Sequence, residues 1–145
     1  IDLVFYNENT DRWLLTDLKT SNSGWSKWTK EDEVKTSQLV LYKEYFAKQF
    51  DIDVEKIDIE NFILKRRVPK DAEFAAMQKR VQSFKPASGK VKRNKAVQGI
   101  ENFIDDAIGA NNEFKTYKPY LTSPSKSNCM FCPAGRMQLC KDAVV

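Results

Sequence analysis

Three residues near the start of the chain are of the types that bind a divalent cation and a phosphate. Asp2 lies in a segment that alternates apolar and polar residues, and Asp17-Leu18-Lys19 lies in a second segment that is otherwise apolar. Side chains two positions apart on a strand project from the same face, so we expect Asp17 and Lys19 to point together. Carboxylate oxygens suit Mg²⁺ or Mn²⁺, and a neighbouring lysine can orient an attacking water and stabilise charge on a phosphate.

A β-hairpin would bring the two carboxylates together, because a short stretch of turn-forming residues separates the two strand-like segments. If Tyr6 pairs with Trp13, the numbers of paired residues sum to 19, and Asp2 lies opposite Asp17 at ~4.5–5.5 Å. Two carboxylates at that distance repel each other unless a cation lies between them. The alternative is that both are ordinary strand charges, with Lys19 paired to one of them.

The pattern of apolar residues predicts an α/β or α+β fold. The expected elements are strands over residues 1–6, 12–20, 57–68 and 81–84 and helices over 30–49, capped by Thr29, and 90–111. This order fits a sandwich of sheet and helices better than an all-helical or all-β fold. We expect a core over residues 1–116 and a cysteine-bearing tail over 117–145, which is rich in Pro and Ser up to its first cysteine.

The composition narrows the possible functions. A chain of 145 residues has room for one compact domain, and it contains no histidine, which excludes Ser-His-Asp, Cys-His and two-histidine zinc catalysis within it. No apolar run approaches the ~20 residues of a membrane span and no signal-peptide pattern is visible, so we expect no membrane partner. The net charge of +4 permits contact with phosphate backbones without establishing it. Three cysteines in the last 17 residues indicate a reducing compartment.

Two further candidate site residues lie in the first expected helix, after the two acidic strands. Gln38 and Tyr42 are four positions apart and therefore share one face of the first expected helix. Together, the segments IDLVFY, LLTDLKTS and SQLVLYKEYF resemble the RecB-like branch of the PD-(D/E)XK nuclease superfamily. That family has an Asp on one strand, (D/E)-x-K on the next and Q-x-x-x-Y on the following helix. The resemblance implies a restriction-endonuclease-like core, with a central mixed sheet flanked by helices.

The resemblance also implies roles for these residues. Asp2 and Asp17 would be ligands of Mg²⁺ or Mn²⁺, together with the backbone carbonyl of Leu18. Lys19 would activate or position the attacking water. The helix residues Gln38 and Tyr42 would brace the active site or touch DNA. The alternative for Tyr42 is a core aromatic, because it also belongs to an apolar stripe.

The implied activity is metal-dependent cleavage of DNA, either single-stranded or with ends, by an exonuclease in repair, recombination or phage replication. A helicase or recombination protein would be the expected partner, and the expected location is the cytoplasm of a bacterium or of a phage host. The alternative is an inactive nucleic-acid-binding or assembly module of the same fold. Family members also have an upstream helix that often adds a His or Glu to the site, and we expect this chain to lack that helix.

The cysteines form a C-x₂-C-x₇-C pattern at Cys129, Cys132 and Cys140. Thiolates at such spacing can ligate one soft metal centre, but three of them are one short of a closed set. The segment SNCMFCPAGRMQLC resembles the C-terminal end of iron–sulfur nucleases of the same superfamily, such as AddB-type and CRISPR-adaptation nucleases. The resemblance implies a [4Fe–4S] cluster whose fourth ligand precedes the nuclease core. A zinc site and free thiols are the alternatives.

Two groups of residues could contact nucleic acid. The tryptophans Trp25 and Trp28 lie between the hairpin and the first helix, where exposed rings could stack on unpaired bases or instead act as lid or core residues. A basic cluster opens the second helix, and it is compatible with phosphate contacts or with an ordinary solvated face. It comprises Lys90, Lys92, Arg93 and Lys95.

Overall fold

The computed structural model of the chain describes residues 1–68, 79–115, 124–137 and 139–144. The chain forms two compact units, Ile1–Ile104 and Asp105–Val145. Within the described ranges, no helix is long and apolar enough to cross a membrane.

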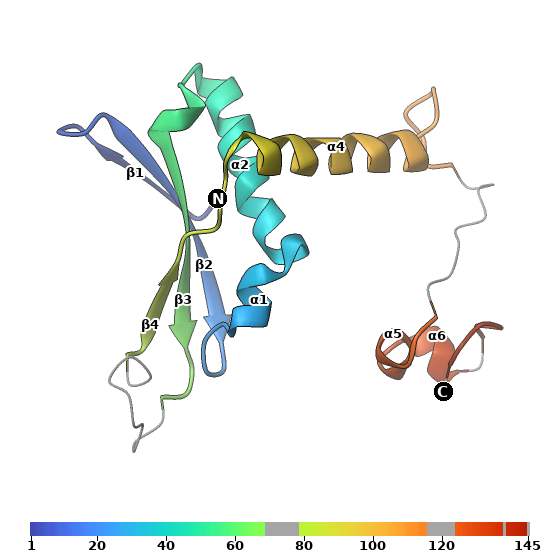
Figure 1. Cartoon of the computed structure of the whole chain (residues 1–145). Helices are drawn as coiled ribbons and strands as arrows, with labels where there is room; N and C mark the ends of the chain where they lie inside the picture. The colour runs from blue at the N-terminus through green and yellow to red at the C-terminus, as the bar shows by residue number, and fades with distance from the viewer. Residues whose placement is uncertain (69–78, 116–123, 138, 145) are drawn as a thin grey trace. The chain divides into compact units, whose positions relative to one another are not determined.

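A four-stranded mixed sheet forms the centre of the first unit (Figure 1). Its strands are β1 (Leu3–Asn7), β2 (Arg12–Ser21), β3 (Ile57–Lys65) and β4 (Val81–Phe84), in the spatial order β1-β2-β3-β4. β1 and β2 are antiparallel, β2 and β3 are parallel, and β3 and β4 are antiparallel. The mixed α/β class predicted from the residue pattern is therefore confirmed, although β3 ends three residues before the predicted position 68.

The hairpin between β1 and β2 has the register that the residue pattern predicts. Tyr6 pairs with Trp13 and Leu3 with Thr16, so the numbers of paired residues do sum to 19. Asn7 stabilises the turn, because its side-chain oxygen accepts hydrogen bonds from the backbone N–H groups of Asn9 and Thr10, at 3.0 and 3.3 Å. The aromatic pair Tyr6 and Trp13 adds a contact with ring centroids 4.6 Å apart. Because Leu3 pairs with Thr16, the residues that precede Leu3 lie near the middle of β2.

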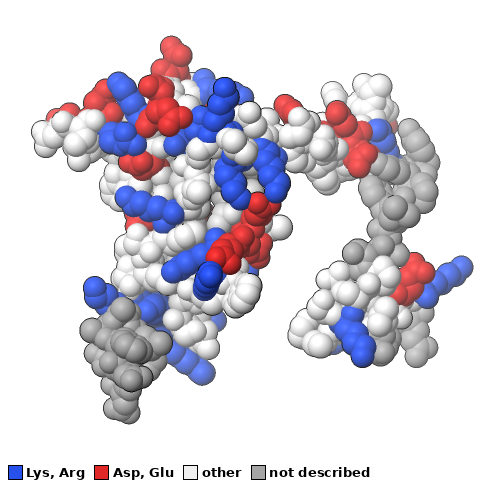
Figure 2. Space-filling model, in the orientation of Figure 1, with Lys and Arg blue, Asp and Glu red and all other residues white. Residues whose placement is uncertain are grey.

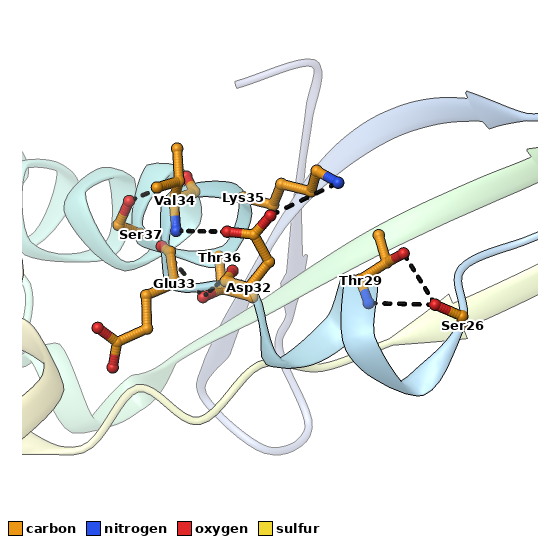
Figure 3. A network of polar contacts seen from close by, with 8 residues as sticks. All are labelled: Ser26, Thr29, Asp32, Glu33, Val34, Lys35, Thr36 and Ser37. Carbon is orange, nitrogen blue, oxygen red and sulfur yellow. Dashed lines mark hydrogen bonds and ion pairs between the residues drawn. The ribbon is translucent and has the colours of Figure 1, made fainter. Parts of the chain in front are cut away.

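The first predicted helix is in fact two helices, α1 (Lys27–Glu31) and α2 (Glu33–Phe50), as the close-up in Figure 3 shows. The predicted N-cap, Thr29, is wrong, since Ser26 caps α1 and accepts a hydrogen bond from the Thr29 N–H at 3.2 Å. Asp32 has an extended backbone and caps α2 by accepting from the Val34 N–H at 3.0 Å. The chain bends at Asp32 because a carboxylate outside the helix satisfies a backbone donor that the helix itself leaves free.

One face of the sheet and α2 form the hydrophobic core. Alternate residues of β3, from Ile57 to Lys65, are buried, and the α2 residues Leu39 and Val40 belong to the same cluster as Leu15 of β2. α2 connects two parallel strands, for which a crossover is required, and it packs on the sheet as it crosses (Figure 1). The odd-numbered positions of β2 and β3 therefore face α2. The candidate site lies on this same face of the sheet.

The last long helix is α4 (Lys90–Ala107), which ends four residues before the predicted position 111. A turn follows it: the Asn112 N–H donates to the Gly109 carbonyl at 3.0 Å, and Asn112 adopts a left-handed backbone with φ 61°. The second unit contains two short helices, α5 (Lys126–Met130) and α6 (Pro133–Arg136). A 3-10 turn, η1 (Val54–Lys56), precedes β3.

Candidate functional site

Asp17 is the most buried acidic residue of the candidate site. It lies in the middle of β2 on the face that packs against α2, and only 4% of its surface is exposed. The Lys19 Nζ lies 2.7 Å from Asp17 Oδ2, on the same face and two positions along the strand. A carboxylate buried to this degree requires a positive partner, because its hydration is lost on folding. The strand alternation thus places both side chains together, as expected.

Lys19 also contacts the helix that covers the sheet. Its Nζ donates a hydrogen bond to Gln38 Oε1 at 3.1 Å, and Gln38 Nε2 donates to the Tyr42 hydroxyl at 2.8 Å. Asp17, Lys19, Gln38 and Tyr42 therefore form one continuous polar chain from β2 to α2, which we call the polar chain. The Tyr42 ring is also partly buried against the hydrophobic core, so this residue combines the two predicted roles of core aromatic and polar partner.

Asp2 reaches β2 from the neighbouring strand. Its backbone N–H donates to the Thr16 carbonyl at 3.3 Å, and its carboxylate accepts a hydrogen bond from the Leu18 N–H at 2.7 Å. The ladder of β1 and β2 ends at the pair Leu3–Thr16, and Asp2 precedes β1, so the pairing of Asp2 with Asp17 stays a prediction. The two hydrogen bonds of Asp2 hold it beside Thr16 and Leu18, the two neighbours of Asp17 on β2. A metal contact from the Leu18 carbonyl stays a prediction.

Asn61 is a buried polar residue that the sequence analysis missed. It is fully buried in β3, and neither its Nδ2 nor its Oδ1 has a hydrogen-bond partner among the described residues. In the parallel register its partner on β2 is Asp17, whose Oδ2 makes an ion pair with Lys19 but no hydrogen bond. A polar residue at an inward position of the apolar segment IDIENFILK was the signal that could have identified it.

The prediction of a hard divalent cation rests on the carboxylates at this part of the sheet. Asp2 and Asp17 supply carboxylates, and Mg²⁺ is commonly bound by one or two carboxylates while it keeps several waters. Over the ranges that the structure describes, no group of three or more His, Cys, Asp or Glu side chains could hold a metal ion. A cation here would therefore need further oxygens from neutral groups, water or a phosphate.

The cysteine segment is the second predicted metal site. Cys129, Cys132 and Cys140 are half-buried free thiols. Cys132 donates its backbone N–H to the Cys129 carbonyl at 3.2 Å, and Cys129 Sγ accepts from the Val144 N–H at 3.4 Å. The described residues contain no thiol group arranged around a common metal position. The iron–sulfur cluster and its zinc alternative stay predictions.

The basic cluster at the start of α4 is largely ion-paired. Lys92 and Lys95 both bind Glu33 of α2, with a Lys92–Glu33 distance of 2.6 Å, and these lysines lower the pKa of Glu33 to about 2. Lys90 is exposed. On the face drawn in Figure 2, basic and acidic side chains are interspersed over the first unit. Phosphate contacts from the three lysines stay predictions.

Arg93, the fourth member of that cluster, differs from the lysines. It is 7% exposed, and its guanidinium pairs with Glu44 at 3.3 Å and Glu55 at 3.0 Å. It also donates to the Ser88 carbonyl at 2.9 Å. These contacts join α4 to α2 and to the 3-10 turn η1, and they favour a structural role for Arg93 over the predicted phosphate contact.

The two tryptophans have different surroundings. Trp25 is half-buried against Phe84, and its backbone exchanges two hydrogen bonds with the Gln82 side chain, at 2.7 and 3.2 Å. Trp28 is 81% exposed on α1. The structure therefore makes Trp25 an anchor of its loop and leaves the ring of Trp28 accessible to a base.

A cavity of about 450 Å³ opens between α1, α2 and α4. Its lining includes Val40, Phe84 and Ile100 but none of the residues of the polar chain. The candidate site, at the boundary of the sheet and α2, therefore does not coincide with this cavity.

The chain was compared with protein families, curated proteins and solved structures. No match was found. The function must therefore be inferred from the residues themselves, and the polar chain with Asp2 and Asn61 is the arrangement that offers defined chemistry.

Proposed function

We propose that this protein is a Mg²⁺- or Mn²⁺-dependent deoxyribonuclease of the PD-(D/E)XK type, in its RecB-like branch. The polar chain carries this proposal. Its two motifs, Asp17-x-Lys19 and Gln38-x-x-x-Tyr42, belong to different elements, and the hydrogen bond between Lys19 and Gln38 joins them at 3.1 Å. Their contact across the sheet–helix boundary is what a shared catalytic role requires, whereas unrelated surface residues would have no reason to meet there.

Each residue of the site has a definite task in phosphodiester hydrolysis. Asp2 and Asp17 would hold the divalent cation, which neutralises phosphate charge and makes water a better nucleophile. An ammonium group has three N–H donors, and Lys19 donates one of them to Gln38 while its charge pairs with Asp17. A further N–H donor would serve an attacking water or a phosphate oxygen.

Gln38 and Tyr42 would act through Lys19. The Gln38 amide accepts from Lys19 and donates to Tyr42, so the helix fixes the direction of a side chain that has many rotamers when free. The ring of Tyr42 is held in turn by the hydrophobic core. A lysine fixed in this way loses less entropy when substrate binds, which is the usual benefit of a preorganised site.

DNA is the proposed substrate, with single strands or ends as the reactive form. The exposed ring of Trp28 supports this choice, because stacking on an unpaired base needs an accessible aromatic face. The cysteine segment is proposed to hold a [4Fe–4S] cluster, and a helicase or recombination protein is the proposed partner. These proposals imply work in the cytoplasm of a bacterium or of a phage host.

The test is digestion of end-labelled single- and double-stranded DNA by the full-length protein with Mn²⁺. Asp17→Asn keeps the size of the side chain and removes its charge, and we expect cleavage to fall by about 10²-fold or more. Asp51→Asn is the matched control, because Asp51 is exposed and its left-handed backbone, φ 52°, suits Asn.

Cleavage by wild type and Asp51→Asn but not by Asp17→Asn would support the proposal, and the labelled ends would give the polarity. Equal cleavage by all three proteins would overturn the role of Asp17. A wild-type protein that binds DNA and never cleaves it would instead be the inactive binding module of the same fold.

A further inference from the structure

Asn61 occupies a position where folding alone would favour an apolar residue. Its neighbours on the same face of β3, Ile59 and Ile63, are buried aliphatic side chains. An amide with neither of its polar atoms hydrogen-bonded loses its contacts with water and receives nothing in exchange. A leucine has the same branching at Cγ and no polar atoms, and it would avoid that loss, so hydrogen bonding within the fold does not explain the residue type at this position.

The position of Asn61 links it to the acidic site. In the parallel ladder its partner is Asp17, and registered residues on adjacent strands project from the same face of the sheet. Both residues therefore face α2, beside Lys19. Asn61 has a free donor and a free acceptor among the described residues, and the Asp17 Oδ2 next to it makes no hydrogen bond.

We propose that Asn61 belongs to the cation site and that its Oδ1 supplies an oxygen ligand beside Asp17. Mg²⁺ and Mn²⁺ prefer six oxygen ligands, and the two carboxylates of Asp2 and Asp17 provide only part of that set. A neutral amide adds an oxygen without adding negative charge, so it does not draw Lys19 into a second ion pair. The Nδ2 group of Asn61 then donates to the Asp17 carboxylate and fixes its orientation.

This inference rests on the proposed metal site but not on DNA cleavage, so it is tested without DNA. The full-length protein is titrated with Mn²⁺ while the electron paramagnetic resonance of free Mn²⁺ and the unfolding midpoint are followed. For Asn61→Leu we expect an unfolding midpoint without metal equal to or above that of wild type. Its Mn²⁺ affinity should be about 10–100-fold weaker.

Thr16→Val is the matched control. Thr16 is 3% exposed, its hydroxyl also has no hydrogen-bond partner among the described residues, and it adjoins Asp17 on β2 but faces the other side of the sheet. Removing this hydroxyl should raise the unfolding midpoint in the same way and leave the Mn²⁺ affinity unchanged. The comparison of the two variants separates the effect of removing any buried polar group, which changes only the unfolding midpoint, from the effect of removing a ligand, which also changes the Mn²⁺ affinity.

A second substitution covers the case in which Asn61→Leu does not fold. Asn61→Asp adds a charged oxygen at the same place, and it should tighten Mn²⁺ binding and lower the unfolding midpoint in the absence of metal. Unchanged Mn²⁺ affinity in a folded Asn61→Leu protein, or in Asn61→Asp, would overturn the inference. So would a lower midpoint of Asn61→Leu without metal, because Asn61 would then be stabilising the fold by itself.

The outcome also distinguishes this inference from the proposed nuclease. If wild type binds Mn²⁺ through Asn61 and fails to cleave DNA, the inference stands and the nuclease proposal fails. If wild type cleaves DNA and Asn61→Leu binds Mn²⁺ normally, only the inference fails. Absence of any Mn²⁺ binding by wild type would overturn both.

Discussion

The sheet–helix site and the cysteine segment are both candidate metal sites, but the protein fixes their side chains in different ways. In the first, β2 and α2 hold Asp17, Lys19 and Gln38 within hydrogen-bond or ion-pair distance of one another. In the second, two thiols lie three positions apart on and after the short helix α5, and the third follows α6. Regular elements place the first set before any ligand is bound.

The difference arises from the structural elements that hold the side chains in place. A strand register and a helix repeat fix side chains through many backbone hydrogen bonds, so the site is preorganised. Thiolates on loops and one-turn helices have few such restraints, and the metal itself often supplies the free energy that orders them. We therefore expect single side-chain substitutions to change the chemistry of the carboxylate site, whereas the order of the cysteine segment should depend on its metal.

The largest effect is expected in the cysteine segment. Full-length protein purified without oxygen should be brown and hold about four irons per chain, and Cys132→Ala should lose them completely. Iron and acid-labile sulfide are measured together with visible absorption. Asp17→Asn is the control and should keep its iron, because it lies in the other unit. Colourless wild type with one equivalent of zinc would identify the alternative site, and protein with neither metal would leave three free thiols.

The next largest effect concerns Lys19. Lys19→Met keeps the aliphatic stem and removes the ammonium that contacts both Asp17 and Gln38, so we expect the cleavage rate to fall by about 10²–10³-fold. Lys27→Met is the control, since its ion pair with Glu31 is exposed and contributes little. The rate is measured at saturating Mn²⁺, with circular dichroism to verify folding. A rate like that of wild type would remove Lys19 from the mechanism.

The two tryptophans provide a comparison of intermediate size. Trp28→Ala should weaken binding of single-stranded DNA by about tenfold and leave the free energy of unfolding unchanged, because the ring is 81% exposed. Trp25→Ala should lower the free energy of unfolding by about 2 kcal/mol, because its ring packs on Phe84. Fluorescence anisotropy and urea unfolding measure the two quantities. The reverse pattern would exchange the assigned roles of anchor and base contact.

The smallest effect is a pH dependence at Glu33. Lys92 and Lys95 lower its pKa from 4.5 to about 2, so the carboxylate binds fewer protons in the folded than in the unfolded protein. Its contribution to stability is complete above the unfolded pKa and is lost as pH falls from about 4.5 toward about 2. The unfolding midpoint of Glu33→Gln should therefore lie below that of wild type at neutral pH. The difference between the two midpoints should shrink as the pH falls from about 4.5 toward about 2.

Salt provides the control for that measurement. Because Glu33 and its lysine partners are exposed, concentrated salt should screen their attraction and reduce the difference at neutral pH. A difference between wild type and Glu33→Gln that persists unchanged at low pH and in concentrated salt would mean that the carboxylate acts through something other than these lysines.

Part of the fold and of the site could be predicted because it depends on short-range periodicity. The spacing of Asp17 and Lys19 predicted their common face, and the turn residues between two strand-like segments predicted the hairpin, in which Tyr6 pairs with Trp13. The single helix predicted over residues 30–49 was wrong because a helical stripe of apolar residues does not reveal that Asp32 leaves the helix to act as a cap. Helix ends depend on such local competition between side chains and backbone.

The sequence by itself thus determined the β1–β2 hairpin, the shared face of Asp17 and Lys19, and the i, i+4 relation of Gln38 and Tyr42. Only the tertiary structure decided which residues from distant parts of the chain lie beside them. The parallel pairing of β2 with β3 places Asn61 next to Asp17, and the packing of α4 buries Arg93 between Glu44 and Glu55. The physical reason is that strand and helix periods order neighbours in sequence, whereas contacts between distant segments depend on how the whole core packs.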